Sequence, residues 1–192
     1  MPRGRASIQA VSSGLAATAE GVEDRPRRTH RFWMLIALVT TPVLALDQLS
    51  KLYISSHFRL YETVPLVQNW LDVTYTLNPG AAFSLFATMP PGFRSVFFIV
   101  LSILAIIVLA VLLMRPATSL ASSVSFALIL GGTIGNLIDR LARGVVIDFI
   151  YFHHNSFSYP VFNVADSAIT VGVAIILLFS VMGERQSGEK AA

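Results

Sequence analysis

The chain has 192 residues, of which 54% are hydrophobic and only 13% are charged, and its formal net charge at pH 7 is +3. Soluble domains carry about 25% charged residues, so this composition argues against a soluble protein and predicts a membrane protein. Because the sequence contains no cysteine, disulfide bonds and thiolate catalysis are excluded.

The first segment, residues 1–31, is rich in positive charge. It holds six of the 14 lysines and arginines, which are Arg3, Arg5, Arg25, Arg27, Arg28 and Arg31. Small residues lie between them, a pattern that predicts a disordered basic tail. A nucleic-acid partner is not expected, because the positive charge abuts an apolar stretch. A cleaved signal peptide is disfavoured, because residues 44–46 are a poor small-residue cleavage site.

Four later stretches are long enough to cross a bilayer, which takes about 20 apolar residues. They are residues 32–54, 96–114, 118–138 and 161–183. We therefore predict a mainly α membrane protein, with a single four-helix transmembrane domain at 32–183 and a short cytoplasmic tail at 184–192. The sequence shows no internal repeat, which argues against an inverted-repeat transporter.

Two connections between the predicted spans have the patterns of β-strands. Residues 73–77 alternate apolar and polar side chains, as in a half-buried strand, and the Asn78-Pro79-Gly80 sequence predicts a turn. Residues 147–152 and 157–162 flank four polar residues, 153–156, and predict a hairpin. Together these segments, within about 56–92 and 144–162, predict a small extracytoplasmic β platform.

The cationic residues predict the orientation in the membrane. Four spans place both termini on one side. Besides the N-terminal tail, the basic residues on that side are Arg115, Arg185 and Lys190. Basic residues near span ends favour the cytoplasm, so we assign both termini to it.

The strongest polar residues then fall near the opposite boundary of the bilayer. At about 1.5 Å per helical residue, Asp47 lies about 22 Å across, Lys51 about 28 Å and Asn136 about 27 Å. Asp166 is at the outer end of the last span, and Asp148 is in the connection before it. One polar site at the outer membrane–water boundary is therefore predicted.

Asp148 and Asp166 are the candidate catalytic pair. Two carboxylates can share one proton and one water, with one acting as general base and the other as general acid. Ile147 and Phe149 flank Asp148, and burial between them favours its neutral form. Asn163 is a candidate helix N-cap before Asp166, and the helix dipole favours the ionised form there. The alternative is that Asp166 only caps a helix and Asp148 is a solvated acid.

Other polar residues have helical spacings that predict structural or mixed roles. Asp47 and Lys51 are four residues apart and favour a structural ion pair. Asn136 and Arg140 share a helix face, and Arg140 is suited to hold a carboxylate or a substrate carbonyl. Asp139 is expected to neutralise an arginine on a neighbouring helix. A transporter or a non-catalytic scaffold remains an alternative for such intramembrane charges.

Several further motifs have modest predictive value. Small residues follow the turn in NPGAAFS, residues 78–84, where an extended substrate could dock beside Gly80, although an ordinary tight turn explains them equally. A metal site is not expected, because the adjacent His153 and His154 would point to opposite faces of a strand. A serine hydrolase built on Ser84 lacks the GxSxG motif. Glycines 131, 132 and 135 predict close helix contacts.

Five stretches of this sequence, in the same order, resemble those of the lipoprotein signal peptidases, or signal peptidase II. They are DQLSK (47–51), NPGAAFS (78–84), GGTIGNLIDR (131–140), GVVIDF (144–149) and FNVADSAITVG (162–172). The similarity covers roughly residues 32–183. It implies an aspartic intramembrane protease of the bacterial inner membrane. Such an enzyme removes signal peptides from prolipoproteins that carry diacylglyceryl-cysteine, and it cleaves just before that cysteine.

The resemblance also implies roles for individual residues. Asp148 and Asp166 match the catalytic aspartates. The positions implied to shape the site or bind substrate are Asp47, Lys51, Asn78, Gly80, Asn136, Asp139, Arg140, Asn163 and Ala165. Sensitivity to the cyclic peptide antibiotic globomycin is implied as well. We expect a monomer surrounded by membrane lipid, with no metal and no other cofactor.

Overall fold

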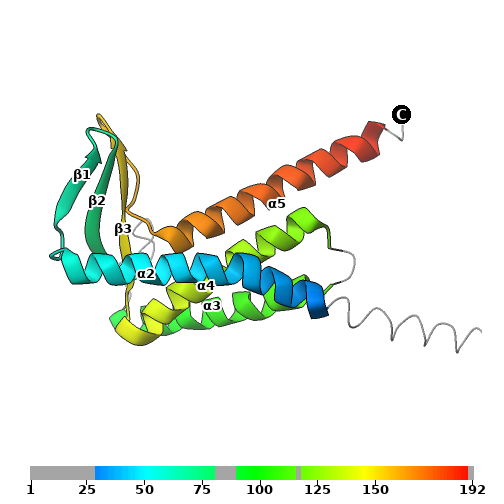
Figure 1. Cartoon of the computed structure of the whole chain (residues 1–192), viewed down its shortest axis with the longest axis horizontal. Helices are drawn as coiled ribbons and strands as arrows, with labels where there is room; N and C mark the ends of the chain where they lie inside the picture. Colours follow the sequence, from blue (N-terminus) through cyan, green and yellow to red (C-terminus); the bar gives the residue numbers. More distant parts are fainter. Residues whose placement is uncertain (1–28, 81–89, 116–117, 190–192) are drawn as a thin grey trace, which may run out of the picture.

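Four helices and a four-stranded sheet make up the computed structural model, which describes residues 29–80, 90–115 and 118–189 (Figure 1). The first helix runs through Thr29–His57 and includes the π-helical turn η1 (Ile36–Thr40) and α2 (Thr41–His57). The others are α3 (Pro91–Leu113), α4 (Leu120–Arg143) and α5 (Val164–Glu189). Each contains a segment long and apolar enough to cross a membrane, which confirms the four predicted spans.

The helix ends follow from local sequence and differ from the predicted ends by a few residues. Pro42 lacks the N–H of a regular turn, which explains the wider π-helical turn just before it. Ser119 caps α4 by accepting a hydrogen bond from the Ser122 N–H, and Gly144, with φ of 75°, ends it. Because α4 continues to Arg143, Asp139 and Arg140 belong to this helix.

Glycines on α4 allow its neighbours to approach closely, as predicted. A Cβ at Gly132 would collide with the backbone oxygen of Ala165 on α5, and a Cβ at Gly135 would collide with the carboxylate of Asp47 on α2. At Gly131 a Cβ would lie 3.0 Å from the backbone oxygen of Thr40. These contacts bring the polar residues of α2, α4 and α5 together.

The sheet lies at one end of the helices, beside the end of α2 (Figure 1). Its strands are β1 (Thr63–Val67), β2 (Leu71–Asn78), β3 (Val146–His154) and β4 (Phe157–Ser158), all antiparallel and in sequence order. Ile147 and Phe149 of β3 pack with Ile54 of α2 in a small hydrophobic core. The sheet therefore places β3 against the helices that carry the polar residues.

The predicted strands are correct for β2 and partly wrong for the second hairpin. His153 and His154 belong to β3 rather than to the turn, which contains Asn155 with φ of 51°. The returning strand has only two residues, because Pro160 lacks the N–H that pairing requires, although Phe162 still bridges to Ile150. The strand β1 was not predicted individually: all five of its residues are exposed and Pro65 interrupts any alternation.

Candidate active site

Asp148 lies on β3, opposite Thr76 of β2, and its side chain is almost fully buried. The Asn78 Nδ2 donates to its Oδ2 at 2.9 Å, and the Asn163 Nδ2 donates to its Oδ1 at 2.7 Å. Asn78 is itself fixed, because its Oδ1 accepts a hydrogen bond from the Gly80 N–H at 2.8 Å. Gly80 has φ of 92°, a conformation that suits glycine. The Asn78–Gly80 turn thus orients Asp148.

Asp166 lies in the first turn of α5, where Asn163 is the N-cap that the sequence predicted. The Asp166 N–H donates to the Asn163 Oδ1 at 2.9 Å, and the Asn163 N–H donates to the Asp166 Oδ2 at 3.3 Å. This is the reciprocal arrangement of a capping box. The Asn136 Nδ2 donates to the Asp166 Oδ1 at 2.8 Å. Both carboxylate oxygens of Asp166 are therefore held.

The two aspartates are joined through Asn163, which contacts both of them. Each of their carboxylate oxygens accepts a hydrogen bond from an asparagine. Among the described residues, no lysine or arginine forms a salt bridge with either aspartate. Burial raises the pKa of Asp148 to about 7, and the charge of Asp166 contributes in the same direction, while the asparagine donors oppose it. The pair is suited to share a proton near neutral pH.

Next to the aspartate pair lies an ion cluster, which we define as Asp47, Lys51, Asp139 and Arg143; the first three are buried and Arg143 is exposed. The Lys51 Nζ is 2.8 Å from the Asp47 Oδ2 and 2.9 Å from the Asp139 Oδ2, and it donates to the Asn136 Oδ1 at 3.1 Å. The predicted pairing of Asp47 with Lys51 is confirmed. Lys51 thereby connects the ion cluster to Asn136, which holds Asp166.

The prediction for Asp139 was wrong in its partner. Asp139 pairs with Lys51 of the neighbouring helix and with Arg143 of its own helix, at 2.8 Å, rather than with an arginine of a neighbouring helix. Because α4 runs past the expected end at 138, Arg143 lies one turn after Asp139 on the same helix. Asp139 also accepts a hydrogen bond from the Ile147 N–H at 3.2 Å, next to Asp148.

Ala165 contributes through its backbone. Its N–H donates to the Asp47 Oδ1 at 3.0 Å, so that a carboxylate of α2 satisfies a free amide at the start of α5. Gln48 was missed as a site residue; its Nε2 donates to the Asp47 Oδ2 at 3.0 Å and to the Gly135 oxygen at 3.1 Å. Its position within DQLSK was the available signal. Ala81, Ala82 and Ser84 lie outside the described residues.

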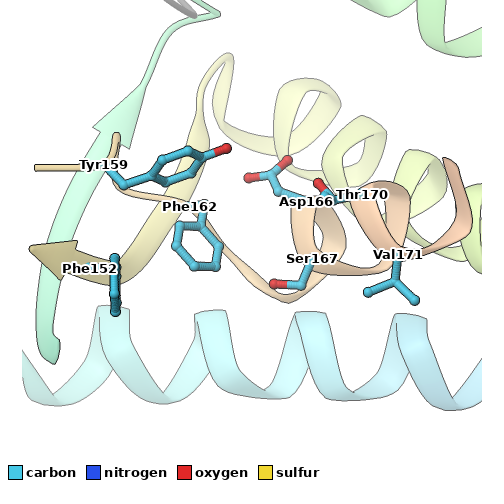
Figure 2. A pocket seen from close by; sticks show the side chains of 7 residues that line it. All are labelled: Phe152, Tyr159, Phe162, Asp166, Ser167, Thr170 and Val171. Carbon is cyan, nitrogen blue, oxygen red and sulfur yellow. The ribbon is translucent and has the colours of Figure 1, made fainter. Parts of the chain in front are cut away.

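Asp166 borders two cavities. One, of about 360 Å³, lies between α5 and the β3–β4 region (Figure 2). Its aromatic side chains, Phe152, Tyr159 and Phe162, gather on one side, while Asp166 and Ser167 of α5 lie on the other. Reacting groups can therefore reach the Asp166 carboxylate from an apolar environment.

The second cavity, of about 280 Å³, is lined by residues of α3, α4 and α5, including Asn136, Arg140 and Asp166. The Arg140 Nη1 donates to the backbone oxygen of Asn136 at 3.3 Å, which confirms that the two residues share a helix face. The guanidinium lies over the Phe98 ring at 5.2 Å. Arg140 thus brings a positive charge to a cavity that Asp166 also lines.

Comparisons with known proteins point to one family. The family model described as signal peptidase (SPase) II matches residues 39–182. The lipoprotein signal peptidase of Syntrophus aciditrophicus is 36% identical over 80% of this chain and 96% of its own length. That of Syntrophotalea carbinolica is 42% identical over 75% of this chain and 89% of its own.

Solved structures show the same architecture. A bacterial membrane enzyme solved at 2.3 Å resolution is 30% identical and has a TM-score of 0.67, covering 76% of this chain and 87% of its own. A second bacterial membrane enzyme, solved at 1.9 Å, has a TM-score of 0.66 at 29% identity, covering 74% of this chain and 89% of its own. The chain therefore belongs to the signal peptidase II family of aspartic proteases and is a multi-pass bacterial membrane protein.

Proposed function

We propose that this chain cleaves prolipoproteins that carry a diacylglyceryl-cysteine, at the peptide bond just before that cysteine, by activating a water between Asp148 and Asp166. The observation that carries the proposal is the hydrogen bonding of these two aspartates, of which Asp148 is buried and Asp166 partly buried. Asparagines hold every carboxylate oxygen, and Asn163 contacts both residues. Neutral donors orient the two acids without supplying the positive charge that would fix both as anions.

The proton is assigned to Asp148 at rest. Its raised pKa of about 7 keeps a large share of Asp148 neutral at physiological pH, whereas Asp166 lies at a helix N-terminus, where backbone dipoles favour an anion. In the first step Asp166 takes a proton from the water, whose oxygen attacks the scissile carbonyl carbon. Asp148 gives its proton to the carbonyl oxygen, so that a neutral gem-diol forms.

The second step breaks the C–N bond. Asp166 gives the proton it received to the leaving nitrogen of the cysteine, while Asp148 takes a proton back from a hydroxyl of the gem-diol. The products are the carboxyl end of the signal peptide and the free amine of the lipidated cysteine. Asp148 is again protonated and Asp166 again ionised, so one water has been consumed and no proton is lost.

The other site residues are proposed to position the pair and the substrate. Asn78, Asn136 and Asn163 orient the carboxylates directly. The ion cluster acts at a distance, through Lys51 on Asn136 and through Asp47 on the Ala165 N–H. Gly80 shapes the turn that holds Asn78. Arg140, which lines a cavity together with Asp166, is placed to receive a carbonyl oxygen of the substrate.

We further propose that both termini are cytoplasmic, with the tails at 1–31 and 184–192, and that the site faces the outer leaflet. The sheet lies at the end of α2 that is remote from its N-terminal end, and Asp148 lies on this sheet (Figure 1). A lipidated cysteine keeps its acyl chains in the bilayer and its peptide at the surface. Asp166 suits such a substrate, because it begins a membrane-spanning helix and borders an aromatic, mainly apolar cavity.

The proposal is tested with purified protein in detergent and a synthetic prolipoprotein peptide, prepared with and without diacylglycerol on its cysteine. Mass spectrometry is expected to find a product that begins with the lipidated cysteine, and globomycin is expected to block its formation. Cleavage at another bond, or equal cleavage of the unlipidated peptide, would contradict the proposed specificity.

A further inference from the structure

A third cavity, of about 380 Å³, lies on the other side of the sheet from the aspartate pair. Tyr53 and Ile54 of α2, with Phe58 just after this helix, form one wall. Val64 and Leu66 of β1 form another, and Phe149 of β3 lies between them. On β3, adjacent side chains point to opposite faces, so Phe149 faces this cavity while Asp148 faces its asparagine partners. Asp166 lines the two other cavities and does not line this one.

The lining is suited to hydrocarbon. None of the residues that line the cavity is charged, and the Ser50 hydroxyl already donates to the Asp47 backbone oxygen at 2.9 Å. An apolar cavity of this kind offers water too few hydrogen-bond partners to be stably filled by it. A peptide backbone would likewise lose its hydrogen bonds there. An aliphatic chain makes no hydrogen bonds, so it loses none when it enters the cavity.

The cavity also continues a bilayer-facing surface. Leu46, Leu49 and Tyr53 lie on one face of α2, at the spacing i, i+3, i+7, and are 62%, 64% and 57% exposed. Asp47, Lys51 and Ile54 point inward on the opposite face. Since α2 belongs to a membrane-spanning helix, lipid chains run along this leucine face, and its last member, Tyr53, lines the cavity.

A positive group follows where a lipid headgroup would be. Arg59 comes directly after Phe58, and its side chain is exposed, next to the exposed His57 ring that stacks on Tyr53 with ring centroids 4.3 Å apart. A phosphate is the group that the Arg59 guanidinium would attract at a membrane surface. From these features we propose that the cavity binds one acyl chain of an anionic bilayer phospholipid, as a site separate from the one for the substrate.

The test uses the full chain in nanodiscs that contain phosphatidylglycerol with a photoactivatable diazirine in one acyl chain, followed by mapping of the labelled peptides. Labelling of residues 50–58 and 64–73 is expected to exceed that of the exposed face of α3, at Val100 and Leu104, severalfold. Labelling equal to that of α3 would show only bulk lipid contact and would overturn the proposal.

Variants make the test specific. Leu66→Trp fills the cavity and is expected to reduce this labelling to the level of α3, whereas Val67→Trp, at the next residue and outside the lining, is expected to leave it unchanged. Val64→Phe is a smaller filling change for use if Leu66→Trp does not fold. Unchanged labelling in a folded filling variant would contradict the proposal. Loss of labelling when saturating lipidated substrate peptide is added would assign the cavity to the substrate instead.

Discussion

Two groups of buried acids lie side by side in this chain, and their partners differ. Asp47 and Asp139 share the ammonium of Lys51, and Asp139 also pairs with Arg143. Asp148 and Asp166 receive hydrogen bonds from asparagines instead. In the ion cluster the two negative and two positive charges balance. Among the described residues no lysine or arginine forms a salt bridge with the aspartate pair, and the charges of Lys51 and Arg140 act on it only from further away. The proposed mechanism requires the protonation of this pair to change during the reaction.

The comparison predicts which acids are structural and which are catalytic, although Asp148 is as buried as the acids of the ion cluster. Asp47, Asp139 and Asp148 are all at most 2% exposed, so burial alone does not separate them. The separating feature is the charge of the neighbours. Substitutions in the two groups should therefore differ in kind: those in the pair should affect activity, and those in the ion cluster should affect stability.

The largest expected effect is on cleavage by variants of the pair. Asp148→Asn and Asp166→Asn each remove an acid–base group, so the cleavage rate of a lipidated prolipoprotein should fall by about 10³-fold or more. Melting temperatures in detergent should change little, because Asn keeps the shape of Asp. The matched control is Asp72→Asn, whose carboxylate pairs with His153 on the sheet. Near-normal cleavage by either variant of the pair would refute its catalytic role.

The second effect is on stability. Lys51→Met leaves Asp47 and Asp139 buried without their shared cation, which should destabilise the protein by roughly 3–5 kcal/mol. Thermal unfolding in detergent measures this loss. The double variant Lys51→Met/Asp47→Asn removes one of the stranded charges and should recover part of it. If Lys51→Met were as stable as the parent protein, the distinction between the two groups would fail.

A smaller effect is expected when one orienting asparagine is removed. Asn78→Ala deletes a hydrogen bond to Asp148, which should lower kcat by about 10- to 100-fold. That hydrogen bond favours the ionised form, so its loss should also move the alkaline limb of the pH–rate profile to higher pH. Thr74→Ala on the same strand, whose hydroxyl accepts a hydrogen bond from the Thr63 hydroxyl, is the control. A fall in kcat without a shift of the profile would argue for a purely structural effect.

The pH dependence follows from the pKa of Asp148. Since this pKa is about 7 and Asp148 must be protonated to act as the acid, kcat/KM should fall about tenfold per pH unit above that value. This alkaline limb of the pH–rate profile reflects the coupled titration of both aspartates rather than that of one residue. A rate that stayed constant from about pH 6 to about pH 9 would contradict the assignment.

The raised pKa of Asp148 also makes the stability of the folded protein depend on pH. The folded protein holds the Asp148 proton more tightly than the unfolded chain does, because the pKa rises from 3.8 to about 7. The contribution of Asp148 to stability is therefore largest below the lower value and decreases as pH rises through this window. The melting temperature of the parent protein relative to Asp148→Asn should decrease over the same range.

The smallest expected effect is that of metal removal. Within residues 29–80, 90–115 and 118–189, no group of three or more His, Asp or Glu side chains is placed to hold a metal ion. His153 pairs with Asp72, while His154 stacks on Trp70. EDTA should leave the cleavage rate unchanged. Strong inhibition that zinc reverses would overturn the metal-free mechanism.

The sequence predicted the parts of the fold that follow from local pattern. The four spans came from apolar length, the N-cap role of Asn163 from its position, and the pairing of Asp47 with Lys51 from helical spacing. The exposed strand β1 lacks such a pattern, whereas the end of α4 has a local signal in Gly144 that the predicted bounds did not use. Contacts between distant segments, such as that of Lys51 with Asp139, depend on how closely the glycines of α4 let the helices approach. The spacing of residues along the sequence does not predict this approach.

The capping box at the start of α5 has one more consequence. Asp166 is at once the residue that begins the last membrane helix and half of the proposed acid–base pair. If this helix began one residue earlier or later, Asp166 would turn by about 100° and leave Asn136. With Asp148 and Asp166 as the acid–base pair, we expect a newly made chain to be inactive as a protease until its last helix has inserted in the membrane and packed in register.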